Sequence, residues 1–89
     1  MPVFMVERRY AERLEVSAEG AAEINRINGD EGVRWLSSFL SADRRKTFCL
    51  YEAADAETIH RAAQRAGLPS DVVVELSGEV SPDATFSPM

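Results

Sequence analysis

Four short segments of the chain carry apolar residues in the pattern of β-strands. They are residues 3–9, 33–41, 47–52 and 72–76. Segments of this length that are rich in valine and aromatic residues are typical of strands. In the first segment, Phe4 and Val6 fall on one face because side chains alternate along a strand. Val3, Met5 and Glu7 fall on the other face.

Two further segments carry apolar residues at helical spacing. Ser17 is suited to cap the start of the first helix, because its hydroxyl can accept a backbone N–H. Gly29 with Gly32 ends that helix. Asp55 is suited to cap the second helix, and Gly67 lies where a left-handed residue is expected at its end. The sequence therefore predicts one helix after the first strand and another after the third.

The predicted order is strand, helix, two strands, helix, strand, which is the split βαβ pattern of a ferredoxin-like fold. We therefore expect an α+β fold, a βαββαβ sandwich with a four-stranded antiparallel sheet and two helices on one face. Residues 1–80 are predicted to form this single domain. Prolines at positions 82 and 88 mark residues 81–89 as a C-terminal tail.

The face of the sheet away from the helices is also predicted to be apolar. In residues 33–41, simple alternation places Trp35 and Phe39 on one face and Leu36 and Leu40 on the other. Trp35 is therefore expected to be a buried anchor. A contiguous apolar face is rare in monomers. Because pairing of two sheets would cover it, the sequence predicts a homodimer in the form of a dimeric α+β barrel.

The charge of the chain disfavours two classes of partner. It carries 15 acidic against 10 basic residues, with a formal net charge of −5. Phosphate backbones and anionic membranes attract basic surfaces, so we expect neither nucleic acid nor a membrane as a partner. No apolar run approaches the ~20 residues of a membrane span. With Cys49 as the single cysteine, no internal disulfide can form, and a cytoplasmic location is expected.

Two motifs resemble a known family. Residues 46–53 read KTFCLYEA, and residues 66–71 read AGLPSD. Together with the first two strands, they resemble a family of short bacterial domains, catalogued as being of unknown function, that has nickel-binding proteins among its members. The resemblance extends from Pro2 to about Val80 and implies ferredoxin-like dimers. The arginines at 44 and 45 with Lys46, outside these motifs, are expected to form a solvated hairpin tip.

The metal site of that family is not expected in this chain. The resemblance implies histidines in the first strand and beside the AGLP turn, where this chain has Ala62 and Ala63. The single histidine, His60, is displaced by about one helical turn and is a weak candidate ligand. A nickel site would need several imidazoles. We therefore predict no metal site and no cofactor, and we expect Cys49 to be an inert, buried thiol.

A ligand site is predicted where the first three strands bring polar and aromatic side chains together. Its candidate residues are Glu7, Arg9, Trp35, Tyr51 and Glu52. Polar groups that converge among aromatic side chains are typical of small-molecule pockets. The competing interpretation is an ion pair at the strand ends beside core aromatics. The sequence has no Ser-His-Asp set, Cys-x-x-Cys motif or Gly-rich phosphate loop, so no catalytic residue is predicted.

Two functions remain open at the level of sequence. The first is a small non-enzymatic binding or sensing domain, dimeric, with a small-molecule ligand. The alternative is a dimeric α+β-barrel enzyme of the monooxygenase or isomerase kind. A cavity of several hundred Å³ lined by Trp35 and Tyr51 would favour either of these, whereas a filled core would favour a structural role.

Overall fold

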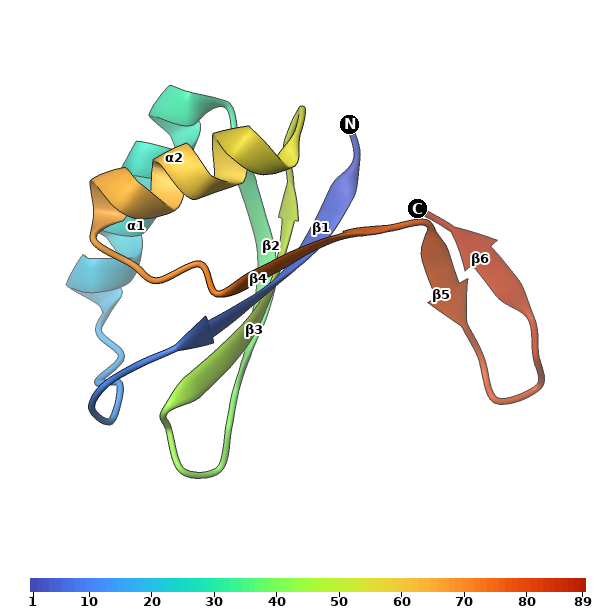
Figure 1. Ribbon diagram of the computed structural model, residues 1–89, viewed down its shortest axis with the longest axis horizontal. Helices are drawn as coiled ribbons and strands as arrows, with labels where there is room; N and C mark the ends of the chain where they lie inside the picture. The colour runs from blue at the N-terminus through green and yellow to red at the C-terminus, as the bar shows by residue number, and fades with distance from the viewer.

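The computed structural model describes residues 1–89 and contains two helices and six strands (Figure 1). The main domain is built in the order β1, α1, β2, β3, α2, β4. The bounds of these elements are Val3–Arg9, Ala18–Glu31, Arg34–Leu40, Lys46–Glu52, Ala56–Ala66 and Val72–Leu76. The predicted βαββαβ order is confirmed.

The four strands of the main domain form one antiparallel sheet in the order β2-β3-β1-β4. In the register of the two central strands and β4, Val6 lies opposite both Cys49 and Val73. Both helices cover the same face of this sheet (Figure 1). The predicted ferredoxin-like sandwich is therefore confirmed. Neither helix has the length and hydrophobicity of a membrane-spanning segment.

The helix boundaries follow from the predicted caps. The Ser17 hydroxyl accepts from the third backbone N–H of the first turn of α1, and Asp55 Oδ1 accepts from the N–H of Thr58 at 2.8 Å in α2. Bonds from the Thr58 hydroxyl and N–H also lower the pKa of the Asp55 carboxyl. Both helices end at a glycine in the left-handed region, Gly32 at φ 72° and Gly67 at φ 69°.

The hydrophobic core lies between the sheet and the helices, mainly under α2. Its fully buried members are Phe4, Val6, Val33, Cys49, Tyr51, Ala53, Ile59 and Ala62. In contrast, α1 buries only Ile27 and Asn28 near its C-terminal end. That end is also tied to α2, because Glu31 accepts from Arg61 and Arg65 at 2.8 and 3.2 Å. The N-terminal half of α1 has no comparable attachment to the core.

The face of the sheet away from the helices is apolar, and we call it the open face. By strand register it carries Val3, Met5, Phe39, Phe48, Leu50, Val72, Val74 and Leu76. Phe39 is 59% exposed and Val74 is 47% exposed. No element of the chain covers these side chains (Figure 1).

Strand β2 departs from the simple alternation that its sequence suggests. Trp35 lies opposite Tyr51, but the next paired residue is Ser37, so Leu36 is an extra residue in a β-bulge. The bulge reverses the faces of all later residues. Phe39 therefore points to the open face while Trp35 points to the helices, and the prediction that they share a face was wrong. Trp35 packs against the core but stays partly exposed.

The segment predicted as a tail contains regular structure. Strand β5, Gly78–Val80, pairs with β6, Phe86–Pro88, in a hairpin that projects away from the main domain (Figure 1). Gly78 allows the two strands to approach, since a Cβ atom there would lie 2.5 Å from both the Phe86 ring and the Ser87 carbonyl oxygen. Residues 81–89 are thus mostly the turn and second strand of this hairpin.

Candidate functional site

A cavity of about 250 Å³ lies on the helix side of the sheet, beneath the N-terminal half of α1. We call it the α1 cavity. Of its 16 lining residues, 10 are hydrophobic. The lining includes Arg8, Tyr10, Leu14, Glu15, Ser17, Gly20, Ala21, Ile24, Trp35, Ser38, Thr47, Cys49 and Tyr51. Pockets for drug-sized ligands span roughly 300–1,000 Å³, so this cavity suits a smaller molecule.

The cavity exists because small side chains of α1 face the sheet. Gly20 and Ala21 line it where larger residues would fill the space. The helix is held to the core only through its C-terminal half, around Ile27 and Asn28. A space is therefore left between the N-terminal half of α1 and the aromatic side chains of β2 and β3.

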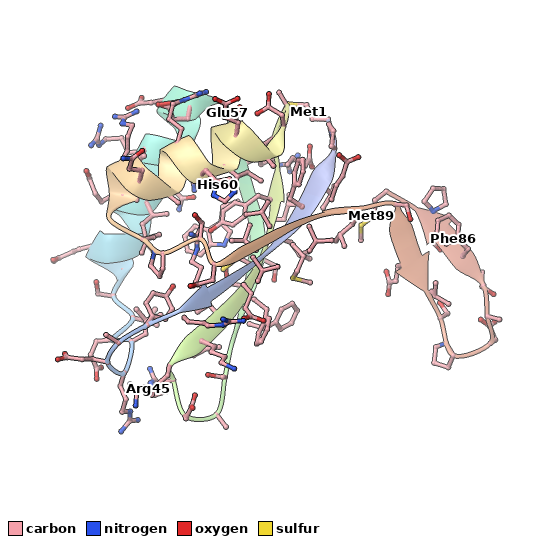
Figure 2. The ribbon with its side chains drawn as sticks, in the orientation of Figure 1. Met1, Arg45, Glu57, His60, Phe86 and Met89 are labelled. Carbon is pink, nitrogen blue, oxygen red and sulfur yellow. The ribbon has the colours of Figure 1, made fainter.

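The outer wall of the cavity is residues 10–17, which precede α1. Backbone hydrogen bonds join this wall to the turn between β2 and β3: Tyr10 N donates to Arg45 O at 2.8 Å, and Leu14 N donates to Arg44 O at 2.7 Å. The Arg45 guanidinium donates to the carbonyl of Ala11. Figure 2 shows Arg45 at the end of the molecule where this turn meets the wall. The basic turn was predicted to be only solvated, and in fact it fixes the wall.

Arg8 is the charged residue buried at the cavity. It is 3% exposed, and it lies on the same face of β1 as Phe4 and Val6. Its Nη1 donates to the carbonyl of Pro69 at 2.5 Å, and its Nη2 donates to the Tyr51 hydroxyl at 3.2 Å. Its Nε is buried without a hydrogen-bond partner.

No carboxylate forms a salt bridge with Arg8, whereas five other arginines pair with acids. Besides the two oxygens, the guanidinium faces the Tyr51 ring, whose centroid lies 5.5 Å from the guanidinium carbon. A ring face and neutral oxygens stabilise a cation without neutralising it. The cavity therefore has a net positive charge at its buried side.

Two aromatic side chains form the floor of the cavity. The rings of Trp35 and Tyr51 have centroids 6.5 Å apart and are tilted by 31°. Burial raises the pKa of the Tyr51 hydroxyl to about 12, against the opposing effect of the Arg8 charge. Tyr51 is thus a neutral hydrogen-bonding group at physiological pH.

The indole, hydroxyl and phenol groups of the cavity other than Tyr51 have hydrogen-bond partners within the chain. The Trp35 Nε1 donates to Ser38 Oγ at 2.7 Å, and the Tyr10 hydroxyl lies 3.0 Å from Thr47 Oγ1. Arg8 stands apart from these groups, because its Nε is one of only two buried side-chain nitrogen atoms without a partner.

The structure brings together two of the five predicted ligand residues, Trp35 and Tyr51. Glu7 and Arg9 lie on the open face and pair with each other, with Arg9 Nε 2.6 Å from Glu7 Oε2. Glu52 lies on the open face at the opposite end of the strands.

Strand alternation separates these three charged residues from Trp35 and Tyr51, because the charged side chains point to the open face and the two aromatic side chains point to the helices. Arg8 was not among the predicted ligand residues. The signal was available, because Arg8 follows the buried Phe4 and Val6 at a spacing of two.

The predicted weak metal candidate lies outside the cavity. His60 is exposed on α2, and its Nδ1 is 2.8 Å from Ser70 Oγ (Figure 2). Cys49 is buried and lines the cavity floor. No cluster of three or more His, Cys, Asp or Glu side chains lies close enough to hold a metal ion.

Comparison with known proteins agrees with this fold. A family model described as "Nickel responsive protein SCO4226-like" matches residues 4–76. The crystal structure of SCO4226 from Streptomyces coelicolor A3(2) is similar, with a TM-score of 0.68 and 21% identity over 88% of this chain and 99% of that one. No match was found among curated proteins. The resemblance of the sequence motifs is confirmed: the chain belongs to the nickel responsive protein SCO4226-like family.

Proposed function

We propose that this chain is a small binding or sensing domain whose ligand is a small, largely apolar molecule held in the α1 cavity. The observation that carries the proposal is the cavity itself, floored by Trp35 and Tyr51. Membership of a family described as nickel responsive supports the broader class, a small binding or sensing domain.

An unfilled cavity is costly in so small a domain. Protein interiors are packed about as densely as organic crystals, and the walls of a void lose dispersion contacts. An 89-residue chain has little stability to lose in this way. A purely structural domain would gain by filling the space with one larger side chain from α1. A bound molecule accounts for the small residues at Gly20 and Ala21.

Nickel is not part of the proposal for this chain. The candidate donors are separated, because His60 is exposed on α2 while Cys49 is buried in the cavity floor. His60 is the only imidazole of the chain, and it already has a hydrogen-bond partner in Ser70. These residues do not fit a nickel site, which draws on several nitrogen or sulfur ligands.

The proposed domain works as a homodimer. The open face presents a contiguous set of apolar side chains from all four strands of the sheet, which supports sheet-to-sheet pairing with a second copy. Charged pairs lie at its two ends, Arg9 with Glu7 and Arg34 with Glu52. A self-complementary apolar centre with a charged rim is typical of a two-fold interface.

Two alanines of α1 provide the test of the binding proposal. Ala21 lines the cavity, whereas Ala22 is exposed and does not. We expect Ala21→Leu to fill the cavity and abolish binding of small aromatic probes such as phenylacetamide. Ala22→Leu is the matched control and should bind as the wild type does. Trp35 is the only tryptophan, so its fluorescence reports on the cavity directly.

Native mass spectrometry of the purified protein should complement the titration. Retention of a small molecule by wild type and Ala22→Leu, and not by Ala21→Leu, would support the proposal. Equal responses of all three proteins to every aromatic probe would contradict it. Conversion of a bound molecule into a product would instead support the enzymatic alternative in the same cavity.

A further inference from the structure

We infer that the α1 cavity selects anions, and that its ligand class is a small molecule with one carboxylate and an apolar or aromatic body. This inference rests on the proposed binding function and specifies the chemistry of the same site. Arg8 is the residue that would receive the carboxylate.

Arg8 carries its charge into the interior of the domain. A guanidinium keeps its charge at every physiological pH, so it cannot respond to burial by losing a proton. Burial of an ion is unfavourable, and a well-placed counter-charge offsets part of that cost. Arg8 is 3% exposed and has no carboxylate partner in the chain. The missing counter-charge is what an anionic ligand would supply.

The guanidinium of Arg8 is also incompletely hydrogen-bonded. Of its three donor nitrogens, Nη1 is directed to Pro69 O and Nη2 to the Tyr51 hydroxyl, which leaves Nε without a partner. Buried donors in native proteins are nearly always bonded. Arg8 also lines the cavity, so a ligand there would lie beside a guanidinium whose hydrogen bonds within the chain are incomplete. A carboxylate oxygen is the acceptor that forms the strongest bonds with arginine.

The rest of the cavity defines the body of the ligand. The N-terminal turn of α1 contributes Ser17 and Gly20, and a helix N-terminus also favours negative charge. Opposite lie the Trp35 ring and apolar side chains such as Ile24 and Leu14. Glu15, the only acidic residue of the lining, is exposed to solvent. A single carboxylate facing Arg8, with an aromatic ring over Trp35, matches this distribution.

The competing explanation is that Arg8 serves only the fold. Its bond to Pro69 O ties the segment between α2 and β4 to the sheet. In that case Arg8 would contribute to stability and would not discriminate between charged and neutral ligands. The two explanations predict different ratios between the affinity for an anionic ligand and the affinity for a neutral ligand of the same shape. A change in folding stability alone does not alter this ratio.

Phenylacetate and phenylacetamide provide that ratio, because they have nearly the same shape and differ in charge. Both would be titrated against wild type, Arg8→Gln and the control Arg9→Gln, whose side chain lies on the open face. We expect wild type and Arg9→Gln to prefer phenylacetate by about tenfold or more. Arg8→Gln should lose this preference and retain the affinity for phenylacetamide.

Each outcome separates the inference from the proposed function. If wild type binds acid and amide equally, the anion selection is wrong and the binding function stands. If neither probe binds to wild type, both are overturned. Should Arg8→Gln fail to fold, the test rests on wild type: the ¹⁵N-labelled Nε–H resonance of Arg8 should shift with phenylacetate and not with phenylacetamide. Equal shifts with both probes would overturn the inference.

Discussion

The hydroxyl of Tyr51 lies between the core and the Arg8 guanidinium, and its ionisation is a sensitive probe of that environment. Desolvation raises its pKa from 10.0 to about 12. In the unfolded chain the phenol would ionise first as the pH rises. Folding stability should therefore be insensitive to this group below pH 10 and fall between pH 10 and about 12. The loss corresponds to about 2–3 kcal/mol.

Alkaline titration of the phenolate absorbance would measure this shift. The difference between wild type and Tyr51→Phe isolates the Tyr51 signal, because Tyr10 is the only other tyrosine. The difference signal should appear near pH 12, together with unfolding. A difference signal that appears near the ordinary value of 10 would mean that Tyr51 is in contact with water.

At the level of single residues, the alternation of side chains along β1 was a better guide to the site than the residue types alone. The faces of Phe4, Val6 and Glu7 were predicted correctly from their spacing. The same rule assigns Arg8 to the buried face, but arginine is rarely buried, and Arg8 was not among the predicted site residues. The groups that contact its guanidinium, Pro69 O and the Tyr51 hydroxyl, are 61 and 43 residues away along the chain, and no local pattern signals such contacts.

Two glycines in different elements should respond to alanine in opposite directions. Gly29 lies inside α1, and a Cβ atom there would meet no atom within 4 Å. Gly29→Ala should therefore stabilise the protein by about 0.5–1 kcal/mol, because alanine loses less backbone entropy in a helix. Thermal unfolding would measure this gain, and a lower melting temperature would contradict it.

In Gly78→Ala, the added methyl would collide with the Phe86 ring and the Ser87 carbonyl. We expect the β5–β6 hairpin to open while the main domain keeps its melting temperature. Amide exchange at Val80 and Phe86 should become fast. Loss of protection throughout the sheet would show instead that the hairpin is part of the cooperative unit.

The hairpin and the bulge are the elements that the sequence analysis did not anticipate. The hairpin strands have three residues each, which is too short for a reliable alternation pattern. The bulge inserts one residue between Trp35 and Ser37, and both neighbours continue an ordinary strand composition. The long elements with caps were predicted because several local signals agreed at each end.

For the whole molecule, the testable property is self-association through the open face. We expect Phe39→Lys and Val74→Lys to convert a dimer into a monomer, because each places a charge among apolar side chains of the interface. Light scattering at tens of micromolar, a concentration suited to modest affinities, would measure the mass. Ala22→Lys on α1 is the control and should leave the mass unchanged.

The contrary result is equally clear. Wild type that scatters as a monomer at this concentration would exclude the homodimer, and the open face would then need another partner.

The layers of the molecule could be predicted from sequence because two helices can cover only one face of four strands. The cavity could not, since its volume depends on how far α1 stands from the sheet.

The bulge in β2 also determines where the length of the chain can change. Leu36 is one residue more than the pairing with β3 requires, so its deletion would restore a regular ladder. Trp35 would still face the cavity, and Phe39 would still face outward. Deletion of one residue from the regular β3 strand would instead turn every later side chain of that strand to the opposite layer. At the bulge of β2, an edge strand of this sheet, a single-residue gap between relatives would therefore leave both faces of the sheet intact.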